Sequence, residues 1–314
     1  MKILVIDNVH PVFYQSLPQH AICIDATKLS SDAIQPLLHD VQVIVIRSRL
    51  AIDKAFIDAA PNLRVILRAG AGLESIDTDY AQAKGIACFN SPEGNRDAVA
   101  EHAMGMLLML LHRLHLANAS VKKGEWQRES FRGTELGGKR VGIIGYGHMG
   151  STFAKKLSAF NCELLVYDKY KSPIADPFVR QVSLAELKQQ SEIISLHVPL
   201  TAETTHYIDQ NFIAECKHPF ILLNLARGKC VQTEALLQGL ESKKIKGACL
   251  DVNEYEDTSF NQGAWHHQLL PHWESLKQHD DVILTPHIGG WTVESFYKIA
   301  QVLASKLMEY QLVP

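Results

Sequence analysis

Short runs of apolar residues recur along the whole chain, and segments with helical spacing separate them. The runs are continuous rather than alternating, which is typical of parallel strands buried on both faces. Their alternation with helical segments predicts a doubly wound α/β fold. The first set of runs is Ile3–Ile6, Ala21–Ile24, Val43–Ile46, Val65–Leu67 and Ile86–Phe89, and the second is Val141–Ile144, Leu164–Tyr167, Ile193–Leu196, Ile221–Asn224, Gly247–Leu250 and Val282–Leu284.

The clearest local motif is VGIIGYGHMG at 141–150, followed by a helical segment and by a strand-like run that leads to Asp168. Gly145, Gly147 and Gly150 have the GxGxxG spacing, which permits a tight turn, close approach to a pyrophosphate and close packing of helix on strand. Amide N–H groups at the start of the helix would face the phosphates. Asp168 stands where a carboxylate accepts hydrogen bonds from a ribose diol and repels a 2′-phosphate. The motif therefore predicts NAD rather than NADP.

The position of this motif predicts two domains. The fingerprint normally follows the first strand of a dinucleotide-binding domain, yet here it starts near residue 145. Another α/β segment must therefore occupy the first third of the chain. We expect a substrate-binding domain made of 1–94 and 291–314, interrupted by an NAD-binding Rossmann domain at 95–290. A C-terminal helix beginning near Thr292 would return to the first domain.

Composition excludes several other classes of protein. The 314 residues suffice for two cores, and 46% hydrophobic with 21% charged residues argues against disorder. The net charge of −3 does not indicate binding to nucleic acid. The longest apolar run, Ala103 to Leu111, is too short to span a bilayer. It predicts a buried helix. The six cysteines form no CxxC pair and the N-terminal MKILVID reads as a strand, so we expect reduced thiols and a cytoplasmic location.

Further motifs stand in a fixed order over nearly the whole chain: ILRAGAGLESID (66–77), FNSPEGNRDAVAEH (89–102), WQRESFRGTELGGKRVGIIGYGHMG (126–150), HVPLTAETTHYI (197–208), NLARGKCVQTEAL (224–236), GACLDVNEYE (247–256) and TPHIGG (285–290). Together they resemble the D-isomer-specific 2-hydroxyacid dehydrogenase family, most of all its 3-phosphoglycerate dehydrogenase branch. The resemblance implies a Rossmann domain inserted into a flavodoxin-like substrate domain. It also implies NAD-dependent interconversion of a D-2-hydroxy acid and its 2-oxo acid, with 3-phosphoglycerate as one candidate acid.

The resemblance implies a catalytic set of Arg227, Glu256 and His287. Reduction of a 2-oxo acid needs a hydride and a proton for the carbonyl oxygen, and a histidine suits the proton. A neighbouring carboxylate would orient the imidazole and favour its charged form. Glu256 fits that role, since its spacing from Asp251 and Arg227 selects it over Glu254 in the same acidic stretch. Arg227 would offer a planar fork to the substrate carboxylate and polarise the carbonyl.

The resemblance also implies two sets of binding residues. For the cofactor they are Gly145, Gly147, His148, Met149, Gly150, Asp168, His197, Val198, Pro199, Thr204, Leu225, Ala226, Asp251 and Gly289. For the substrate they are the loop Ala69, Gly70, Ala71 and Gly72, whose N–H groups would hold the carboxylate, and the arginines Arg47, Arg68 and Arg128, which would gather a phosphate. Arg47 and Arg68 could instead pair with local carboxylates.

Two alternatives remain open at this point. One keeps the chemistry but takes an unphosphorylated acid, as a glyoxylate or hydroxypyruvate reductase does. The other is a non-enzymatic, NAD-sensing scaffold, which an intact Arg, Glu and His set disfavours. The resemblance also implies a homodimer, with Arg128 reaching the partner's site and the segment Ala100 to Leu136 as the interface. We expect no nucleic-acid or membrane partner.

The sequence departs from the family pattern in two places that concern the site. The segment between Glu256 and His287 is long and contains Trp265, His266, His267, His272 and Trp273. The histidine spacing matches no known metal site, so we expect a surface lid and no metal. Trp291 stands where a small residue is common, and it would either cap the substrate cleft or pack the domain junction. The sequence ends at Pro314, so we expect the short form of the family without a C-terminal regulatory domain, and we do not expect control by serine.

Overall fold

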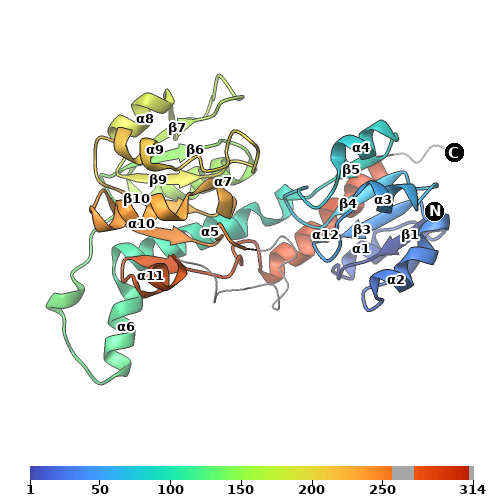
Figure 1. Cartoon of the computed structure of the whole chain (residues 1–314), viewed down its shortest axis with the longest axis horizontal. Helices are drawn as coiled ribbons and strands as arrows, with labels where there is room; N and C mark the ends of the chain where they lie inside the picture. Colours follow the sequence, from blue (N-terminus) through green and yellow to red (C-terminus); the bar gives the residue numbers. More distant parts are fainter. Residues whose placement is uncertain (257–271, 311–314) are drawn as a thin grey trace. The chain divides into compact units, whose positions relative to one another are not determined.

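The computed structural model describes residues 1–256 and 272–310, which divide into two compact units, each with its own parallel sheet (Figure 1). Among the described residues, the first unit comprises 1–96 and 291–310, and the second comprises 97–256 and 272–290. Each unit is described here by itself. The assignment of the first unit to the substrate and of the second to NAD is still a prediction at this point.

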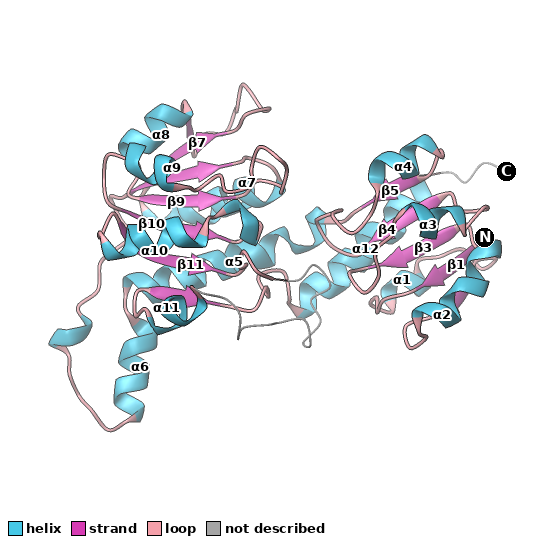
Figure 2. Cartoon of the chain, viewed as in Figure 1, coloured by secondary structure: helices cyan, strands magenta, loops and turns pink. Residues whose placement is uncertain are grey.

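The first unit contains a five-stranded sheet in the order β2-β1-β3-β4-β5, with all pairs parallel (Figure 2). This is the flavodoxin-like order, and it reverses between β1 and β3. The strands are β1 (Lys2–Val5), β2 (Ile22–Asp25), β3 (Val43–Ile46), β4 (Val65–Arg68) and β5 (Ala87–Phe89). The helices are α1 (Val12–Gln15), α2 (Ser31–Ile34), η1 (Gln35–Asp40), α3 (Lys54–Asp58), α4 (Thr78–Ala83) and α12 (Val293–Glu309).

The helix α12 belongs to the core of the first unit although it lies at the other end of the sequence. Ile299, Leu303 and Leu307 are buried in one cluster with strand residues such as Val45 and Leu67. A capping box of Thr292 and Ser295 starts the helix, which confirms the C-terminal helix expected near Thr292.

The second unit contains a seven-stranded sheet in the order β12-β11-β10-β9-β6-β7-β8. All pairs are parallel, and the order reverses between β6 and β9, as in a Rossmann fold. The strands are β6 (Arg140–Ile144), β7 (Glu163–Tyr167), β8 (Arg180–Gln181), β9 (Ile193–Leu196), β10 (Phe220–Asn224), β11 (Ile245–Leu250) and β12 (Val282–Leu284). The helices are α5 (Pro92–Leu111), which starts in the first unit, α6 (Leu114–Lys122), η2 (Glu129–Phe131), α7 (His148–Leu157), η3 (Ser158–Phe160), α8 (Leu184–Gln190), α9 (Gln210–Glu215), η4 (Gly228–Cys230), α10 (Thr233–Glu241) and α11 (Trp273–Gln278).

Each of the eleven strand-like apolar runs overlaps a strand, and the doubly wound α/β class is confirmed. The edge strand β8 was not predicted, because its two residues, Arg180 and Gln181, are polar and form no apolar run. The apolar run Ala103 to Leu111 lies within α5 and is largely buried, as expected. None of the helices in the described ranges has the length and apolarity that a membrane crossing requires.

Candidate active site

The three predicted catalytic residues follow three neighbouring strands of the second sheet. Arg227 comes after β10, Glu256 after β11 and His287 after β12, and these strands lie side by side in that order. Since the strands are parallel, their carboxyl ends share one edge, which is where open α/β sheets present ligand-binding groups.

His287 and Glu256 form a hydrogen-bonded pair. Nδ1 of His287 lies 3.1 Å from Oε2 of Glu256, and both side chains are partly buried. The backbone of His287 is left-handed, with φ of +55°, and its N–H donates to the carbonyl oxygen of Asp251 at 2.8 Å. Glu254 makes different contacts: it lies 2.6 Å from Nε2 of His206 and accepts from the N–H of Thr233 at 2.8 Å. Of the two glutamates, only Glu256 is therefore in a position to orient the imidazole.

Asp251 holds the loop that carries His287. Its buried carboxylate accepts hydrogen bonds from the Thr285 hydroxyl at 2.6 Å and from the N–H groups of Ile288 at 2.9 Å and Gly289 at 2.7 Å. Burial raises the pKa of Asp251, but its hydrogen bonds to His102, Thr285 and the two amides outweigh that effect and leave the pKa below its usual value. The carboxylate therefore stays charged and fixes the loop. The resemblance to the family also implies that Asp251 belongs to the cofactor-binding set.

His102 is a site residue that sequence reasoning missed. It lies on α5, and its Nε2 is 3.0 Å from the Thr285 hydroxyl and 3.4 Å from Oδ1 of Asp251. One signal was available, because His102 is a histidine directly before the buried apolar run of this helix. Its partners could not be read from the sequence, since Thr285 is 183 positions away.

Arg227 is positioned by the turn that follows β10. The Asn224 side chain accepts from the N–H of Ala226 at 3.1 Å and donates to the carbonyl oxygen of Arg227 at 2.9 Å. The guanidinium donates to the carbonyl oxygen of Ala226 at 2.6 Å. The next residue, Gly228, lies so close to the loop after β11 that a Cβ there would come within 1.8 Å of the Asn253 carbonyl oxygen. The loops that carry Arg227 and Glu256 are therefore in contact.

The glycine turn after β6 has the geometry that a dinucleotide pyrophosphate needs. Gly145 has φ of +93°, and a Cβ at Gly150 would lie 2.0 Å from the carbonyl oxygen of Gly145. A side chain is therefore excluded at both positions. Gly147 forms the N-cap of the ten-residue helix α7, and a Cβ there would meet open space. This helix end, with its amide N–H groups and open space at Gly147, fits an anion.

Asp168, the residue predicted to bind the ribose, also accepts hydrogen bonds from backbone N–H groups of this region. It accepts the N–H of Tyr146 at 2.6 Å on one oxygen and those of Tyr170 and Lys171, each at 2.9 Å, on the other. Burial raises the pKa of Asp168, but these three hydrogen bonds and the charge of Lys171 outweigh that effect. The pKa of Asp168 is therefore below its usual value. A carboxylate has about four acceptor positions, so one remains for a ribose hydroxyl.

The other predicted cofactor residues cluster near the point where the order of strands reverses. The His197 carbonyl oxygen and the Val198 side chain approach Gly145, and Thr204 accepts from the N–H of Thr201 and donates to the Pro199 carbonyl oxygen. Burial lowers the pKa of the His197 imidazole to about 4, so this ring is neutral at pH 7. Its Nε2 lies 2.9 Å from the Ser195 hydroxyl.

The remaining members of this set differ in exposure. Leu225 and Ala226 are buried after β10, whereas His148 is exposed and Met149 is partly buried at the start of α7. Gly289 has no room for a side chain, since a Cβ there would lie 2.7 Å from Oδ2 of Asp251.

In the first unit, Arg47 lies at the point where the order of its sheet reverses. Asp7 follows β1 and Arg47 follows β3, and Oδ2 of Asp7 accepts the N–H groups of Arg47 at 2.6 Å and Ser48 at 3.1 Å. Within the described ranges, no residue accepts a hydrogen bond from the Arg47 guanidinium or forms an ion pair with it. Its face is stacked on the indole of Trp291, 3.8 Å from the ring centroid.

The predicted carboxylate-binding loop follows β4. Its carbonyl groups are held, since Ser91 N–H donates to Gly70 at 2.8 Å and the Asn90 amide donates to Ala71 at 2.5 Å. The N–H of Ala69 donates to Ile46, and that of Gly70 to Arg68. Among the described residues, the N–H groups of Ala71 and Gly72 have no acceptor. The Arg68 guanidinium folds over Gly70, where a Cβ would lie 1.8 Å from Nη1.

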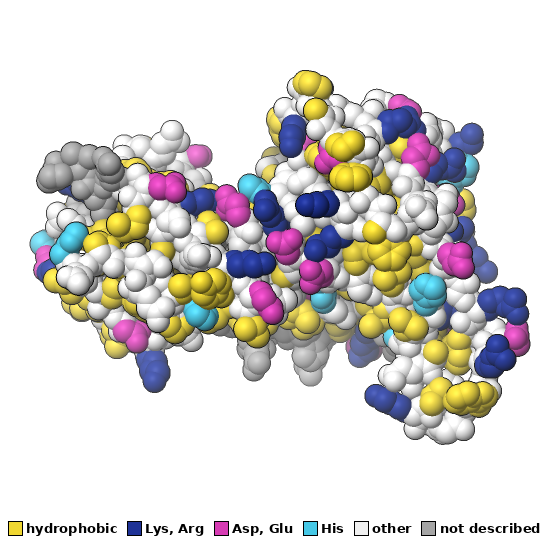
Figure 3. Space-filling view, turned by 180° about the vertical axis from the view of Figure 1, so that it is seen from behind, with side chains coloured by type: hydrophobic (Ala, Val, Ile, Leu, Met, Phe, Trp, Pro, Cys, Tyr) yellow, Lys and Arg dark blue, Asp and Glu magenta, His cyan; other side chains and the backbone are white. Residues whose placement is uncertain are grey.

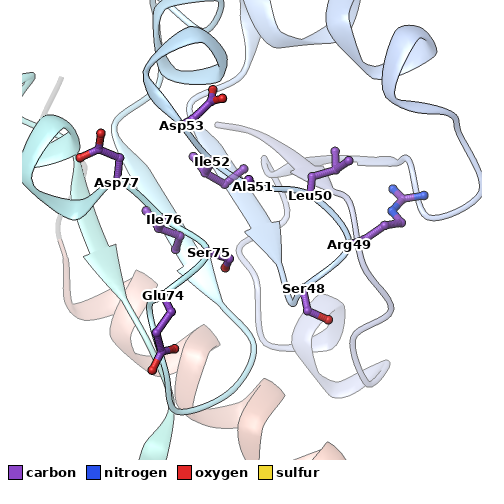
Figure 4. Close-up of a pocket in the computed structure, with 10 residues that line it drawn as sticks. All are labelled: Ser48, Arg49, Leu50, Ala51, Ile52, Asp53, Glu74, Ser75, Ile76 and Asp77. Carbon is purple, nitrogen blue, oxygen red and sulfur yellow. The ribbon is translucent and has the colours of Figure 1, made fainter. Parts of the chain in front are cut away.

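A hollow of about 390 Å³ opens between the loops after β3 and β4, lined by residues 48–53 and 74–77 (Figure 4). Three of its charged side chains, Arg49, Asp53 and Asp77, form contacts that stabilise the first unit. Asp53 and Asp77 cap α3 and α4, and Arg49 donates to the carbonyl oxygens of Ile6, Ala26, Thr27 and Leu29. Among the residues that line this hollow, Arg49 is the only one with a positive charge that could bind an anionic substrate.

Arg128 lies on an arm of the second unit formed by α6 and the segment up to η2, which extends away from the sheet (Figure 1). Apolar and basic side chains share the surface of this arm (Figure 3), and Leu114, Val121 and Trp126 are 53%, 52% and 80% exposed. In the predicted lid, His272 and Trp273 stand at the start of α11, whereas Trp265, His266 and His267 lie outside the described residues.

Comparisons with known proteins agree with this geometry. The family model of the D-isomer specific 2-hydroxyacid dehydrogenase NAD binding domain matches residues 104–289. The hydroxypyruvate reductase of Thermotoga maritima is 38% identical over 90% of this chain and 88% of its own. The D-3-phosphoglycerate dehydrogenase of Methanocaldococcus jannaschii is 34% identical over 98% of this chain, which spans 57% of that relative. A D-lactate dehydrogenase from Aquifex aeolicus, solved with NAD and lactic acid, superposes with a TM-score of 0.80 at 28% identity, covering 99% and 95% of the two chains.

With a matching domain family and relatives that align over most of its length, this chain belongs to the D-isomer specific 2-hydroxyacid dehydrogenase family. It is accordingly an NAD-dependent oxidoreductase that interconverts a D-2-hydroxy acid and its 2-oxo acid. Membership of this family favours an enzyme over the alternative of a non-enzymatic, NAD-sensing scaffold.

Proposed function

We propose that His287 exchanges the proton, and Arg227 binds the carboxylate, of a three-carbon D-2-hydroxy acid that carries a phosphate at its far end. Bound NADH supplies the hydride for the carbonyl carbon. His287 gives a proton to the carbonyl oxygen and takes it back in the reverse direction, while Glu256, 3.1 Å away, keeps the imidazole oriented. Arg227 polarises the carbonyl as negative charge develops on its oxygen.

Residues of the second unit that would hold the cofactor are Gly145, Gly147 and Gly150 at the pyrophosphate and Asp168 at the adenosine ribose. The open helix end at Gly147 and the charged state of Asp168 support this assignment. In the first unit, the N–H groups of Ala71 and Gly72 are the candidates for a further hold on the substrate carboxylate.

We expect Asp168→Asn to narrow the preference for NADH over NADPH by on the order of tenfold or more. The reason is that two negative charges a few ångströms apart repel strongly near a protein surface. The measurement is the ratio of kcat/KM for the two cofactors. Asp176→Ala is the matched control, because Asp176 accepts the Tyr146 hydroxyl at 2.7 Å in the same region. Equal use of both cofactors by the native enzyme would contradict this role of Asp168.

The observation that carries the phosphate proposal is the state of Arg47. A partly buried arginine usually has a carboxylate partner, yet no described residue pairs with this guanidinium. It lies at the reversal point of a doubly wound sheet, where such folds bind ligands. An anionic group on the substrate would supply the missing partner.

The test compares 3-phosphohydroxypyruvate with hydroxypyruvate, which differ only by the phosphate. We expect Arg47→Leu to raise the KM for the phosphorylated acid about tenfold or more, since a charge-assisted hydrogen bond contributes roughly 1.5–3 kcal/mol. The KM for hydroxypyruvate should change little. Lys54→Gln, which removes an exposed charge from the same unit, is the control for long-range electrostatics. If both acids lose equally, Arg47 is structural.

A second candidate substrate is hydroxypyruvate itself, with glyoxylate as a smaller analogue. The similarity to the T. maritima hydroxypyruvate reductase favours it, because that relative is covered over 88% of its length. A native enzyme that reduces hydroxypyruvate at least as well as its phosphorylated form would favour this candidate.

We also propose a homodimer in which the arm around α6 forms the interface and Arg128 reaches the partner's site. The exposed apolar side chains on this arm support the proposal, since a monomer gains nothing by exposing them. A sedimentation measurement that returned the mass of one chain would contradict it. The cytoplasmic location expected from the sequence stays a prediction, which fractionation of cells would test.

A further inference from the structure

Trp291 makes an unusual contact with the candidate substrate residue Arg47. The indole is 64% exposed, and the guanidinium carbon of Arg47 lies 3.8 Å from the centroid of its ring. This distance is well inside the range of about 6 Å over which an arginine is attracted to the face of an aromatic ring.

Rigid elements of the first unit hold both partners. On the Arg47 side, Asp7 fixes the backbone by accepting the N–H groups of three successive residues, Arg47, Ser48 and Arg49. On the other side, Trp291 directly precedes Thr292, the N-cap of α12. That helix is buried in the core and approaches α5 so closely that a Cβ at Gly94 would lie 2.6 Å from the backbone of Ile299.

The first turns of α12 have a second attachment near Trp291. The ring of His10 contacts Phe296 and Tyr297 edge-on, with centroids 5.5 Å and 5.1 Å apart. His10 itself is held by the N–H of Val12, which donates to its Nδ1 at 3.1 Å. The start of the helix is therefore attached to the loop that follows β1.

The stack leaves Arg47 ready to bind an anion. The indole covers a face of the planar guanidinium, whereas the N–H groups point outward from its edge. Among the residues that the structure describes, none accepts a hydrogen bond from this guanidinium. Asp7 is near enough to raise the pKa of Arg47, although burial has the larger effect and lowers it. The Arg47 guanidinium is therefore charged and held against the indole, and its N–H groups are available to donate to an anionic ligand.

We propose that Trp291 is a positioning residue that makes the enzyme selective for acids with an anionic group at the far end, by holding the Arg47 guanidinium in one plane. This inference rests on the proposed function, since it requires Arg47 to bind the substrate's distal anion. A fixed plane lowers the entropy that Arg47 loses when it forms a bidentate contact with a phosphate. The indole's π face, and not its bulk alone, is what holds the plane.

The experiment replaces Trp291 with leucine, which keeps an apolar side chain without a π face, and with phenylalanine, which keeps the face. Steady-state kinetics are measured with 3-phosphohydroxypyruvate and hydroxypyruvate, beside Arg47→Leu. We expect Trp291→Leu to raise the KM for the phosphorylated acid about three- to thirtyfold, the range of a cation–π contact. We expect kcat for both acids and the KM for hydroxypyruvate to stay within about twofold, as at an ordinary surface site.

Trp291→Phe should restore most of the affinity for the phosphorylated acid. Equal KM changes for the two acids, or a leucine variant as good as the phenylalanine one, would overturn the role of Trp291. If Arg47→Leu alone loses the phosphorylated acid selectively, the proposed function stands and the positioning role is wrong. If neither arginine nor tryptophan variant discriminates between the acids, the phosphate proposal fails and the role of Trp291 fails with it.

Discussion

Replacing His287 with alanine is expected to lower kcat by about 10²- to 10⁴-fold, the usual contribution of a general acid–base group. The imidazole is held by Glu256 at 3.1 Å and by a loop that Asp251 anchors, so a proton can be delivered from a fixed point. NADH binding should remain nearly intact, because the residues proposed to hold the cofactor are elsewhere in the unit. The measurements are single-substrate kinetics and a fluorescence titration with NADH.

Two further variants sharpen this prediction. Glu256→Gln keeps the shape of the side chain but removes its charge, and it should cause a smaller loss of kcat than His287→Ala. His20→Ala removes an exposed histidine of the first unit and should leave kcat unchanged. A His287→Ala enzyme with near-native kcat would exclude His287 from proton transfer.

Replacing Arg227 with glutamine should reduce kcat/KM for every 2-oxo acid by about 10²- to 10⁴-fold, which corresponds to two charge-assisted hydrogen bonds of roughly 1.5–3 kcal/mol each. The loss should not depend on whether the acid is phosphorylated, because all these substrates share the carboxylate and the carbonyl. This pattern differs from that of Arg47→Leu, which should affect the phosphorylated acid alone.

Arg227→Lys tests whether the fork or only the charge is needed. Lysine keeps the charge but cannot form a planar bidentate contact, so an intermediate activity is expected. Arg180→Gln is the control, since Arg180 forms exposed ion pairs with Glu163 and Glu186. A loss of less than tenfold in Arg227→Gln would place the carboxylate contact on another residue.

The apolar pattern alone was enough to predict the class of fold. A continuous apolar run such as Ile193–Leu196 is typical of a parallel strand buried on both faces, and it forms β9 with the same bounds. The glycine spacing was equally informative, because Gly145 and Gly150 each stand where a side chain would collide with backbone. The two-residue strand β8 shows the limit of this approach, since its residues are polar and its pairing at the sheet edge leaves no trace in hydropathy.

The candidate site could be predicted only in part. The order of motifs selected Arg227, Glu256 and His287, and the structure adds that Glu256, not Glu254, contacts His287. No feature of the sequence indicated that His102 contacts Thr285 and Asp251, or that Asp168 accepts one amide of the glycine turn and two of the loop that follows β7.

The sequence by itself determined which segments are buried, which turns require glycine and which residue types are available for chemistry, because these are local properties of the chain. Only the tertiary structure decided the partnerships, among them the stacking of Trp291 on Arg47 and the anchoring of the His287 loop by Asp251. The physical reason is that such contacts depend on which strands become neighbours. Several strand orders would bury the same apolar runs equally well, and each would bring a different set of strand ends together.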